Sequence, residues 1–248
     1  IAAGELVAGL ASPGPADPPM ATRTAAGLRI EGVLDHVVAG PHLGLVLTPV
    51  RFDGLLVLAA VRTDGPGVAS TALPTLDRTR LQARIRFDGA AAAQVGDAAA
   101  VDRAVDLLLT AVAVECAGAA RFCLDMTVEY LRTRVQFGRP IGTFQALQHR
   151  CADLAVLVES ATSTAWYAMW AAGADGTVDP VAAPLAKAYC ADAFRRVAGE
   201  TIQLHGGIGF TQEHPAHRYF KRATSTDLLF GGRSWTRAVV ARRAGITA

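Results

Sequence analysis

VDLLLTAVAVECAGAARFCLDMTVEYLRTRVQFGRP (105–140) is the stretch that decides the fold. Its apolar and small side chains recur at alternating steps of four and three residues, which is the spacing of one face of an α-helix. Gly138 and Pro140 would end that helix. The sequence therefore predicts one long helix with a single buried stripe, made of Val105, Leu109, Val112, Cys116, Ala119, Cys123, Met126 and Tyr130.

Further helices are expected downstream. Thr143 can cap a second helix that ends at Gly173 and Gly176, and Asp179-Pro180 is an N-cap followed by proline that opens a third helix to about residue 204. Shorter helices are expected near 215–224 and 233–243. Long antiparallel helices joined by short loops make a bundle. The stripe of the second helix would run through Leu147, Ala152 or Leu154, Leu157 or Val158, Ala161 and Ala165.

Upstream of the long helix, residues 27–95 have strand character. Segments 28–34 and 81–89 alternate apolar and polar residues, and two short apolar runs, 43–52 and 55–62, are separated by Asp53-Gly54, a hairpin motif. No helical pattern intervenes, so we expect an antiparallel sheet in a small barrel or sandwich. The alanine-rich stretch 90–100 is expected to be a connector or a helix start.

The N-terminal residues 1–19 are predicted to precede the β-domain as a separate segment. The first dozen residues have the pattern of a helix fragment, and Ser12–Pro19 is expected to be a loop because it holds four prolines and a glycine. The predicted fold is α+β and mainly α. It divides into a helical remnant with a linker (1–19), a β-domain (20–95) and a helical bundle (96–248).

Composition excludes several classes of protein. A hydrophobic fraction of 51% in 248 residues argues against disorder, and a net charge of +2 with dispersed arginines argues against a nucleic-acid surface. Four cysteines without metal-ligand spacing are expected to be small core residues rather than disulfide or metal ligands, which favours a reducing cytoplasm. No signal peptide is apparent, and no run of apolar residues is long enough to predict a membrane span.

Two segments carry a resemblance to a known family. RTRVQFGRPIGTFQALQHRCADL (132–154) contains Arg-x-x-Phe-Gly and then Ile-Gly-x-Phe-Gln, and QLHGGIGFTQEHPAHRYFKRA (203–223) contains Gln-x-x-Gly-Gly-x-Gly-Phe. Both resemble hallmarks of the acyl-CoA dehydrogenases, in the right order and separation. The resemblance covers roughly 27–248. It implies a small β-domain and a C-terminal four-helix bundle, with the family's N-terminal helical domain largely absent.

The resemblance also implies a FAD site. Six residues are assigned by it to FAD binding, all but Gly206 to the ADP half, and in the family such residues complete the site of a neighbouring subunit. Chemistry agrees with the assignment, because an always-charged guanidinium suits a pyrophosphate and glycines let a ligand approach the backbone. We call these six residues the FAD half-site: Arg134, Phe137, Gln145, Gln203, Gly206 and Gly207.

The family's catalytic base is missing from this pattern. Acyl-CoA dehydrogenases remove the α-proton of an acyl-CoA thioester with a glutamate, and a base must lie within hydrogen-bond reach of its proton. The position that the resemblance gives to that glutamate holds Phe230, or Gly231 if shifted by one. Asp227 and Asp106 are the remaining weak candidates, each displaced from a position the family uses; Glu115 is expected to be a packing or capping carboxylate.

The segments that contact the flavin ring in the family have also changed. They correspond to residues 12–23 and 34–44 here, and neither contains a tryptophan. The chain thus keeps the half-site that it would lend to a neighbour and lacks the one it would use itself. This pattern resembles the non-catalytic chain of α2β2 acyl-CoA dehydrogenases that act on steroid side-chain CoA thioesters.

Three functions remain open at this point. The chain is a partner subunit that completes another chain's FAD site, a self-sufficient dehydrogenase with a displaced base, or a scaffold without chemistry. The first predicts a second dehydrogenase-like chain as partner and an acyl-CoA as substrate. Trp166, Trp170 and Trp235 could be core or interface anchors, and the pattern favours the core.

Overall fold

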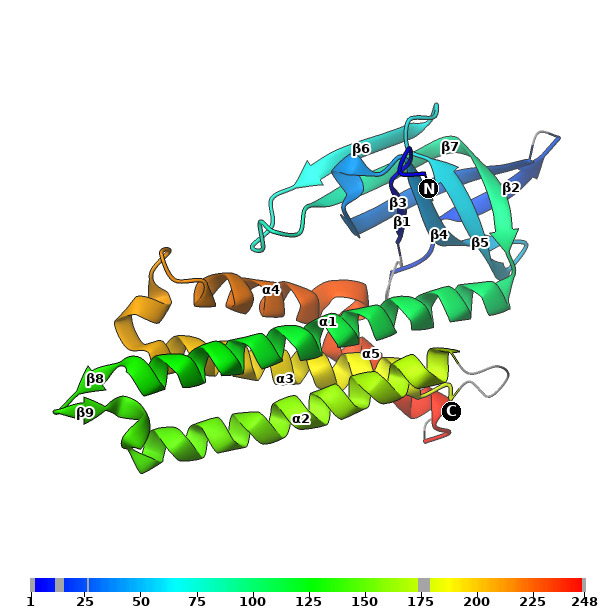
Figure 1. Ribbon diagram of the computed structural model, residues 1–248. Helices are drawn as coiled ribbons and strands as arrows, with labels where there is room; N and C mark the ends of the chain where they lie inside the picture. The colour runs from blue at the N-terminus through cyan, green and yellow to red at the C-terminus, as the bar shows by residue number, and fades with distance from the viewer. Residues whose placement is uncertain (1–2, 12–15, 26, 174–178, 247–248) are drawn as a thin grey trace. The chain divides into compact units, whose positions relative to one another are not determined.

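The computed structural model describes residues 3–11, 16–25, 27–173 and 179–246. Their contacts divide the chain into two compact units. Unit 1 comprises Ile1–Leu108 and Leu229–Gly231, and unit 2 comprises Leu109–Leu228 and Gly232–Ala248. The fold class is the predicted one, a small β-domain followed by a helical bundle (Figure 1).

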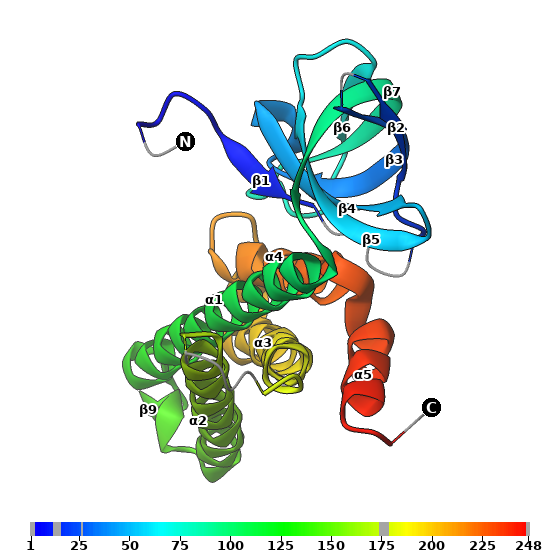
Figure 2. The same cartoon turned by 90° about the vertical axis from the view of Figure 1, so that its right-hand side faces the viewer.

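Unit 1 is built on a closed barrel. Strand β4 pairs with both β2 and β5, β5 pairs with β7, and β3 joins β7 back to β2. The ring is therefore complete, which settles the choice between barrel and sandwich; Figure 2 shows the strands wrapping around one another. The strands are β1 Ala8–Leu10, β2 Met20–Thr24, β3 Gly27–Val38, β4 Leu45–Phe52, β5 Leu55–Arg62, β6 Val68–Leu73 and β7 Gln82–Gly96, with a 3-10 turn η1 at Gly40–His42.

The barrel interior is filled by alternate residues of these strands. Ile30, Val46, Val61 and Ile85 are fully buried, as the period-2 alternation of a half-buried strand requires. The predicted hairpin at Asp53-Gly54 joins β4 to β5, and both residues have positive φ, 48° and 81°. That is the geometry of a type I′ turn. The sheet is mostly antiparallel as expected, except that β1 and β2 each run parallel to β4.

Two predictions for unit 1 are wrong. Residues 8–10 form strand β1 rather than a helix, because they pair with Leu45–Leu47 of β4. The stretch after Ala90 continues β7 to Gly96, since pairing with β5 outweighs the helix propensity of alanine, and the helix start expected within 90–100 is found only at Ala98. Within the expected loop Ser12–Pro19, residues 12–15 lie outside the described residues.

The helices follow the predicted order. They are α1 Ala98–Thr133, α2 Gln145–Gly173, α3 Ala182–His205, α4 Ala216–Leu228 and α5 Gly232–Arg243, with 3-10 turns η2 Ile141–Thr143, η3 Gly206–Phe210 and η4 Leu229–Gly231. The hairpin β8 Val135–Gln136 and β9 Arg139–Pro140 joins α1 to α2. In unit 2, α3 packs against α2, α4 and α5. Gly176 lies outside the described residues.

Neither predicted helix start is reproduced at its residue. Helix α3 begins at Ala182 with Val181 as its N-cap, and the Asp179 carboxylate accepts a hydrogen bond from the Val181 amide at 2.9 Å in the turn just before the helix. Thr143 does not cap α2, because its hydroxyl donates instead to the carbonyl of Pro140 at 2.7 Å. Helix α2 begins only after η2 has turned the chain.

The buried stripes are as predicted for α1 and α2. Cys116 and Cys123 are buried core residues, and α2 buries Leu154, Val158 and Ala161. Trp166 and Trp170 do not belong to this core, because they are 65% and 63% exposed. Their places on α2 fall on the face opposite the alanines that pack inward, so the core prediction for these two residues is wrong.

Among the described residues, one helix could cross a bilayer by length and apolar composition alone, and it is α1. Half of its most apolar window is buried inside the protein. A core helix has this same composition and burial, so the finding is weak evidence for a membrane span.

Candidate functional site

The first part of the FAD half-site lies where α1 ends. Arg134 follows the last residue of α1, and its carbonyl accepts a hydrogen bond from the Ile141 amide at 2.8 Å, which closes the β8–β9 hairpin. The Arg134 side chain is exposed. No hydrogen bond or ion pair joins its guanidinium to any other described residue. The structure therefore leaves this cation free to bind an anion.

Phe137 stands at the tip of that hairpin. Phe137 and Gly138 have φ values of 55° and 76°, so they form a type I′ turn. A phenylalanine in this left-handed conformation is unusual, and such strain is common at functional sites. The ring is 88% exposed. Burial within this chain thus gives no reason for a large aromatic residue at this position.

The second part of the half-site is the end of α3. Gln203 is exposed on the last turn, and the Gly206 amide donates to the Gln203 carbonyl to end the helix. Gly206 has φ of 63°, which favours glycine. Gly207 has no such requirement, since its φ is ordinary and a Cβ atom there would meet nothing within 4 Å. Its missing side chain leaves open space beside the backbone.

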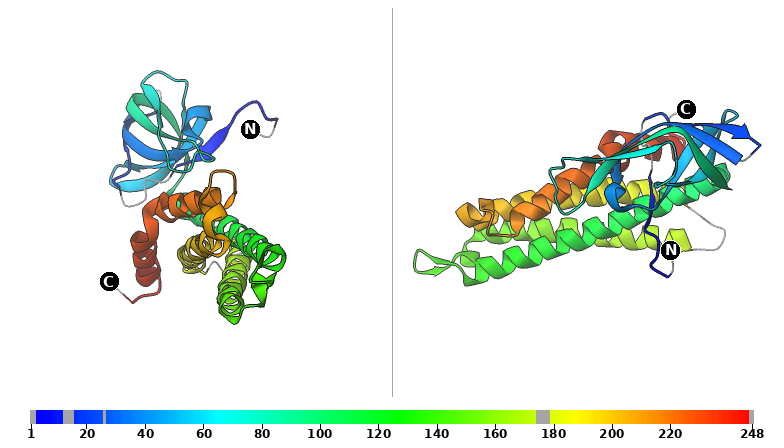
Figure 3. Two further views of the ribbon diagram at one scale, coloured as in Figure 1. Left: turned by 90° about the vertical axis from the view of Figure 1, so that its left-hand side faces the viewer. Right: turned by 90° about the horizontal axis from the view of Figure 1, so that it is seen from above.

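Figures 1 and 3 show that these parts lie at one end of unit 2. The β8–β9 hairpin, the start of α2 with exposed Gln145, and the end of α3 with η3 are all found there. A free guanidinium, an exposed aromatic ring and an open stretch of glycine backbone suit a pyrophosphate with an attached flat ring. The residues of the FAD half-site therefore fit the group that the sequence assigned to them.

Sequence reasoning missed how the glycine turn is held. The His205 ring stacks on Tyr130, with centroids 4.5 Å apart, and on His214 at 4.4 Å. Its Nδ1 donates to the Thr201 carbonyl at 2.7 Å, which leaves a buried Nε2 without a partner among the described residues. Burial lowers the pKa of both His205 and His214. These neutral rings fix the chain on both sides of η3.

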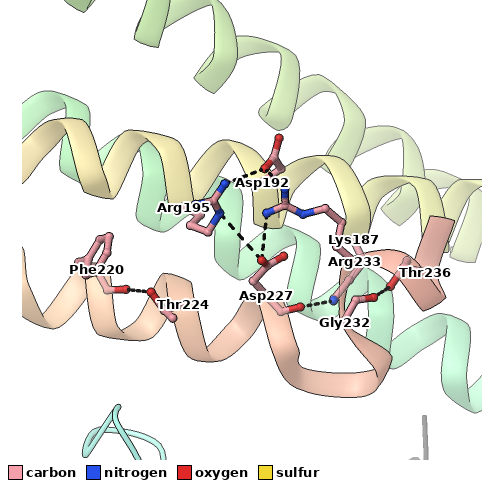
Figure 4. Close-up of polar contacts among 9 residues, drawn as sticks. All are labelled: Lys187, Asp192, Arg195, Phe220, Thr224, Asp227, Gly232, Arg233 and Thr236. Atoms are coloured by element: carbon pink, nitrogen blue, oxygen red, sulfur yellow. Dashed lines mark hydrogen bonds and ion pairs between the residues drawn. The ribbon is translucent and has the colours of Figure 1, made fainter. Parts of the chain in front are cut away.

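Asp227, a candidate base, lies in a network of charges at the end of α4 (Figure 4). One carboxylate oxygen is 3.0 Å from Arg233 Nη2 and 3.9 Å from Arg195 Nε. Arg233 also binds the carboxylate of Asp192, at 3.0 Å. The side chain is only 17% exposed. Asp227 is thus engaged by two guanidinium groups, which is the environment of a structural carboxylate.

Lys187 belongs to the same network and was not noticed in the sequence. Its side chain is fully buried, and its ammonium donates to the backbone carbonyl of Asp227 at 3.2 Å. Burial lowers the pKa of Lys187, and the Asp227 carboxylate opposes that shift. The sequence does contain a signal for this lysine. Lys187 falls at a buried position of α3, next to Ala183, Ala186 and Cys190.

The other candidate positions hold no free carboxylate. Phe230 lies in η4 between α4 and α5 and has φ of 56°, and Gly231 follows it with φ of 105°. Asp106 is half-buried in α1 and has interaction partners. Glu115 forms an ion pair with Arg222 at 2.7 Å, in keeping with its expected packing role.

Comparison with known proteins decides the family. The model of the acyl-CoA dehydrogenase C-terminal domain matches residues 103–245. This chain is a member of the acyl-CoA dehydrogenase family. The match begins within α1, extends past the end of α5 and includes both segments of the FAD half-site.

Two kinds of similar protein are known, sequence relatives and solved structures. Acyl-CoA dehydrogenase IpdE2 of Mycolicibacterium smegmatis is 42% identical over 206 residues, which are 80% of this chain and 63% of IpdE2. The chain therefore spans less than two thirds of that relative. A variant of the Tcur3481-Tcur3483 steroid ACAD has a TM-score of 0.91 at 30% identity, covering 98% of this chain and 68% of that one. The ChsE4-ChsE5 complex from Mycobacterium tuberculosis has a TM-score of 0.84 at 32% identity, covering 99% and 68%.

Proposed function

We propose that this acyl-CoA dehydrogenase chain is the non-catalytic subunit of a heteromeric enzyme, in which it completes the FAD site of a partner chain. The observation that supports this proposal is the end of unit 2, where the Arg134 guanidinium has no partner among the described residues, the Phe137 ring is exposed, and Gly207 has open space beside its backbone. Two solved structures that it resembles are named for pairs of chains. Both facts favour an assembly of two different dehydrogenase-like subunits, for which we propose an α2β2 stoichiometry.

Each residue of the half-site has a defined task in this assembly. Arg134 supplies a fixed positive charge for the pyrophosphate, and a planar guanidinium can bind two oxygens at once. Phe137 offers a flat apolar face, while Gln145 and Gln203 offer amide donors and acceptors for the ribose or adenine. Gly206 turns the chain at the end of α3, and Gly207 lets the ligand approach the backbone. When bound, the flavin supplies the hydride acceptor for α,β-desaturation of an acyl-CoA thioester.

In this proposal the partner chain supplies the base that removes the α-proton of the acyl-CoA. The family position of the base holds Phe230 or Gly231, and neither side chain can accept a proton. Asp227 is held between two guanidinium groups rather than presented to a substrate. A self-sufficient enzyme with Asp227 or Asp106 as displaced base is the alternative. A bulky acyl group of the steroid type is proposed from the name of one structural neighbour.

The test is the flavin content of the complex formed with a second dehydrogenase-like chain that co-purifies with this one. Wild type, Arg134→Ala and Arg134→Lys are each co-expressed with that partner, and bound flavin is measured by absorbance per mole of complex. We expect loss of most flavin with alanine and partial retention with lysine, which keeps the charge but loses bidentate geometry. Arg242→Ala, on the exposed last turn of α5, is the matched control. Unchanged flavin in Arg134→Ala would favour the scaffold without chemistry and reject the proposal.

A further inference from the structure

The backbone conformation of Phe137 is not explained by the residue type alone. The first position of a type I′ turn favours asparagine, aspartate or glycine, because its φ is positive. Phe137 takes that conformation with φ of 55° while its ring is 88% exposed. Neither intrinsic preference nor burial accounts for the placement of the ring.

Two neighbouring side chains form a stack that ends at Phe137. The Phe144 ring meets the Phe137 ring edge-on, with centroids 6.0 Å apart and planes at 89°. The Arg139 guanidinium lies over the Phe144 ring, 4.2 Å from its centroid. An edge-to-face pair and a cation over a ring are both attractive arrangements. We call these three residues the Arg139–Phe144–Phe137 stack.

The backbone that carries Phe144 is itself fixed. The Phe144 amide donates to the Ile141 carbonyl at 3.1 Å, and the Gln148 side-chain amide donates to the Gly142 carbonyl at 3.0 Å. Gly142 lies directly against the end of α1, since a Cβ atom there would meet the Leu131 carbonyl oxygen at 2.9 Å. Phe144 therefore forms a rigid base, whereas Phe137 is a projecting tip.

We propose that Arg139 and Phe144 are positioning residues that hold the Phe137 ring in place for the FAD of the partner subunit. Neither residue belongs to the FAD half-site assigned from the sequence. Their effect on FAD passes through Phe137, because holding a contact residue in its bound conformation before binding removes part of the cost of ordering it. This inference rests on the proposed function, since it takes Phe137 to contact FAD.

The test is a double-mutant cycle on FAD affinity in the assembled complex. FAD is titrated into flavin-depleted complex carrying Phe137→Ala, Phe144→Leu or both, with flavin fluorescence as the readout. We expect each single substitution to weaken binding by about tenfold, or about 1.4 kcal/mol. The double variant is expected to bind no more weakly than Phe137→Ala, because positioning matters only while the ring is present. Arg139→Gln is expected to weaken binding about threefold, in line with an exposed cation over a ring, and Arg242→Gln is the charge control.

Local unfolding must be told apart from loss of positioning. Hydrogen exchange of the Ile141 amide and of the amide of residue 144, which donate to the Arg134 and Ile141 carbonyls, reports whether the hairpin and η2 persist in Phe144→Leu. Protected amides together with a non-additive cycle support the inference. An additive cycle, or unchanged affinity in Phe144→Leu and Arg139→Gln, overturns it. If Arg134→Ala also leaves FAD affinity unchanged, the proposed function itself fails, so the two failures are distinguishable.

Discussion

Truncation of Lys187 tests how unit 2 is held together at the end of α4. The side chain is fully buried in α3, and its ammonium donates to the Asp227 carbonyl. Lys187→Ala removes the γ, δ and ε methylene groups, at about 0.8 kcal/mol each. The residual cavity adds to this loss, while relief from burying a charge subtracts from it. We therefore expect a loss of about 3 kcal/mol in the free energy of unfolding.

Urea denaturation followed by circular dichroism measures this loss. Lys187→Met keeps most of the buried stem and should lose only about 1 kcal/mol, the net worth of one hydrogen bond. Lys221→Ala, on the half-buried face of α4, is the matched control and should change stability less than Lys187→Ala does. If Lys187→Ala stays within about 0.5 kcal/mol of wild type, as surface substitutions do, the stem is not packed as described. Equal losses for alanine and methionine would assign the effect to the ammonium alone.

Three further predictions follow from the site. Asp227→Asn should destabilise the chain by about 1–3 kcal/mol, because a charged hydrogen bond is lost. The same variant should leave turnover by the assembled enzyme unchanged. Abolished turnover with intact flavin would instead identify Asp227 as the base. Gly207→Ala should leave the urea midpoint unchanged but lower the flavin content of the complex. Gly206→Ala should lower the free energy of unfolding by about 1–2 kcal/mol, because its φ is positive. Equal stability losses for the two variants would refute this contrast. Burial lowers the pKa of His205 and His214, so on acidification the unfolded chain binds protons before the folded chain does. The contribution of these neutral rings to the free energy of unfolding is therefore fully present above pH 6.5 and is lost as pH falls below it. A urea midpoint whose pH dependence in this range is unaltered by His205→Gln would contradict this.

Most of the fold could be predicted because its elements obey local rules. The stripe from Leu109 to Cys123 has an unbroken helical period, and Asp53-Gly54 is a strong hairpin motif, so both were located correctly. Strand β1 could not be found in this way, because it exists only through pairing with β4. The strand after Ala90 depends in the same way on β5. Tertiary pairing decided these segments against local propensity.

The site was only partly visible in the sequence. Arg134 and Gly207 stand in motifs, so their positions were named, and the structure adds that the Arg134 guanidinium has no partner among the described residues and that Gly207 has open space beside its backbone. The Arg139–Phe144–Phe137 stack depends on ring geometry that no spacing rule gives. The exposure of Trp166 was also missed, because an aromatic residue at helical spacing fits a core stripe or an outer face equally well.

The central claim is tested most directly by one measurement, the visible flavin spectrum and native mass of this chain purified alone and together with its partner chain. The account predicts little flavin in the chain alone, and a flavin-bearing complex of tetramer mass when the two are co-expressed. A stoichiometric flavin spectrum from the chain alone would contradict it, and would return attention to a self-sufficient enzyme with Asp227, Asp106 or Glu115 as its base.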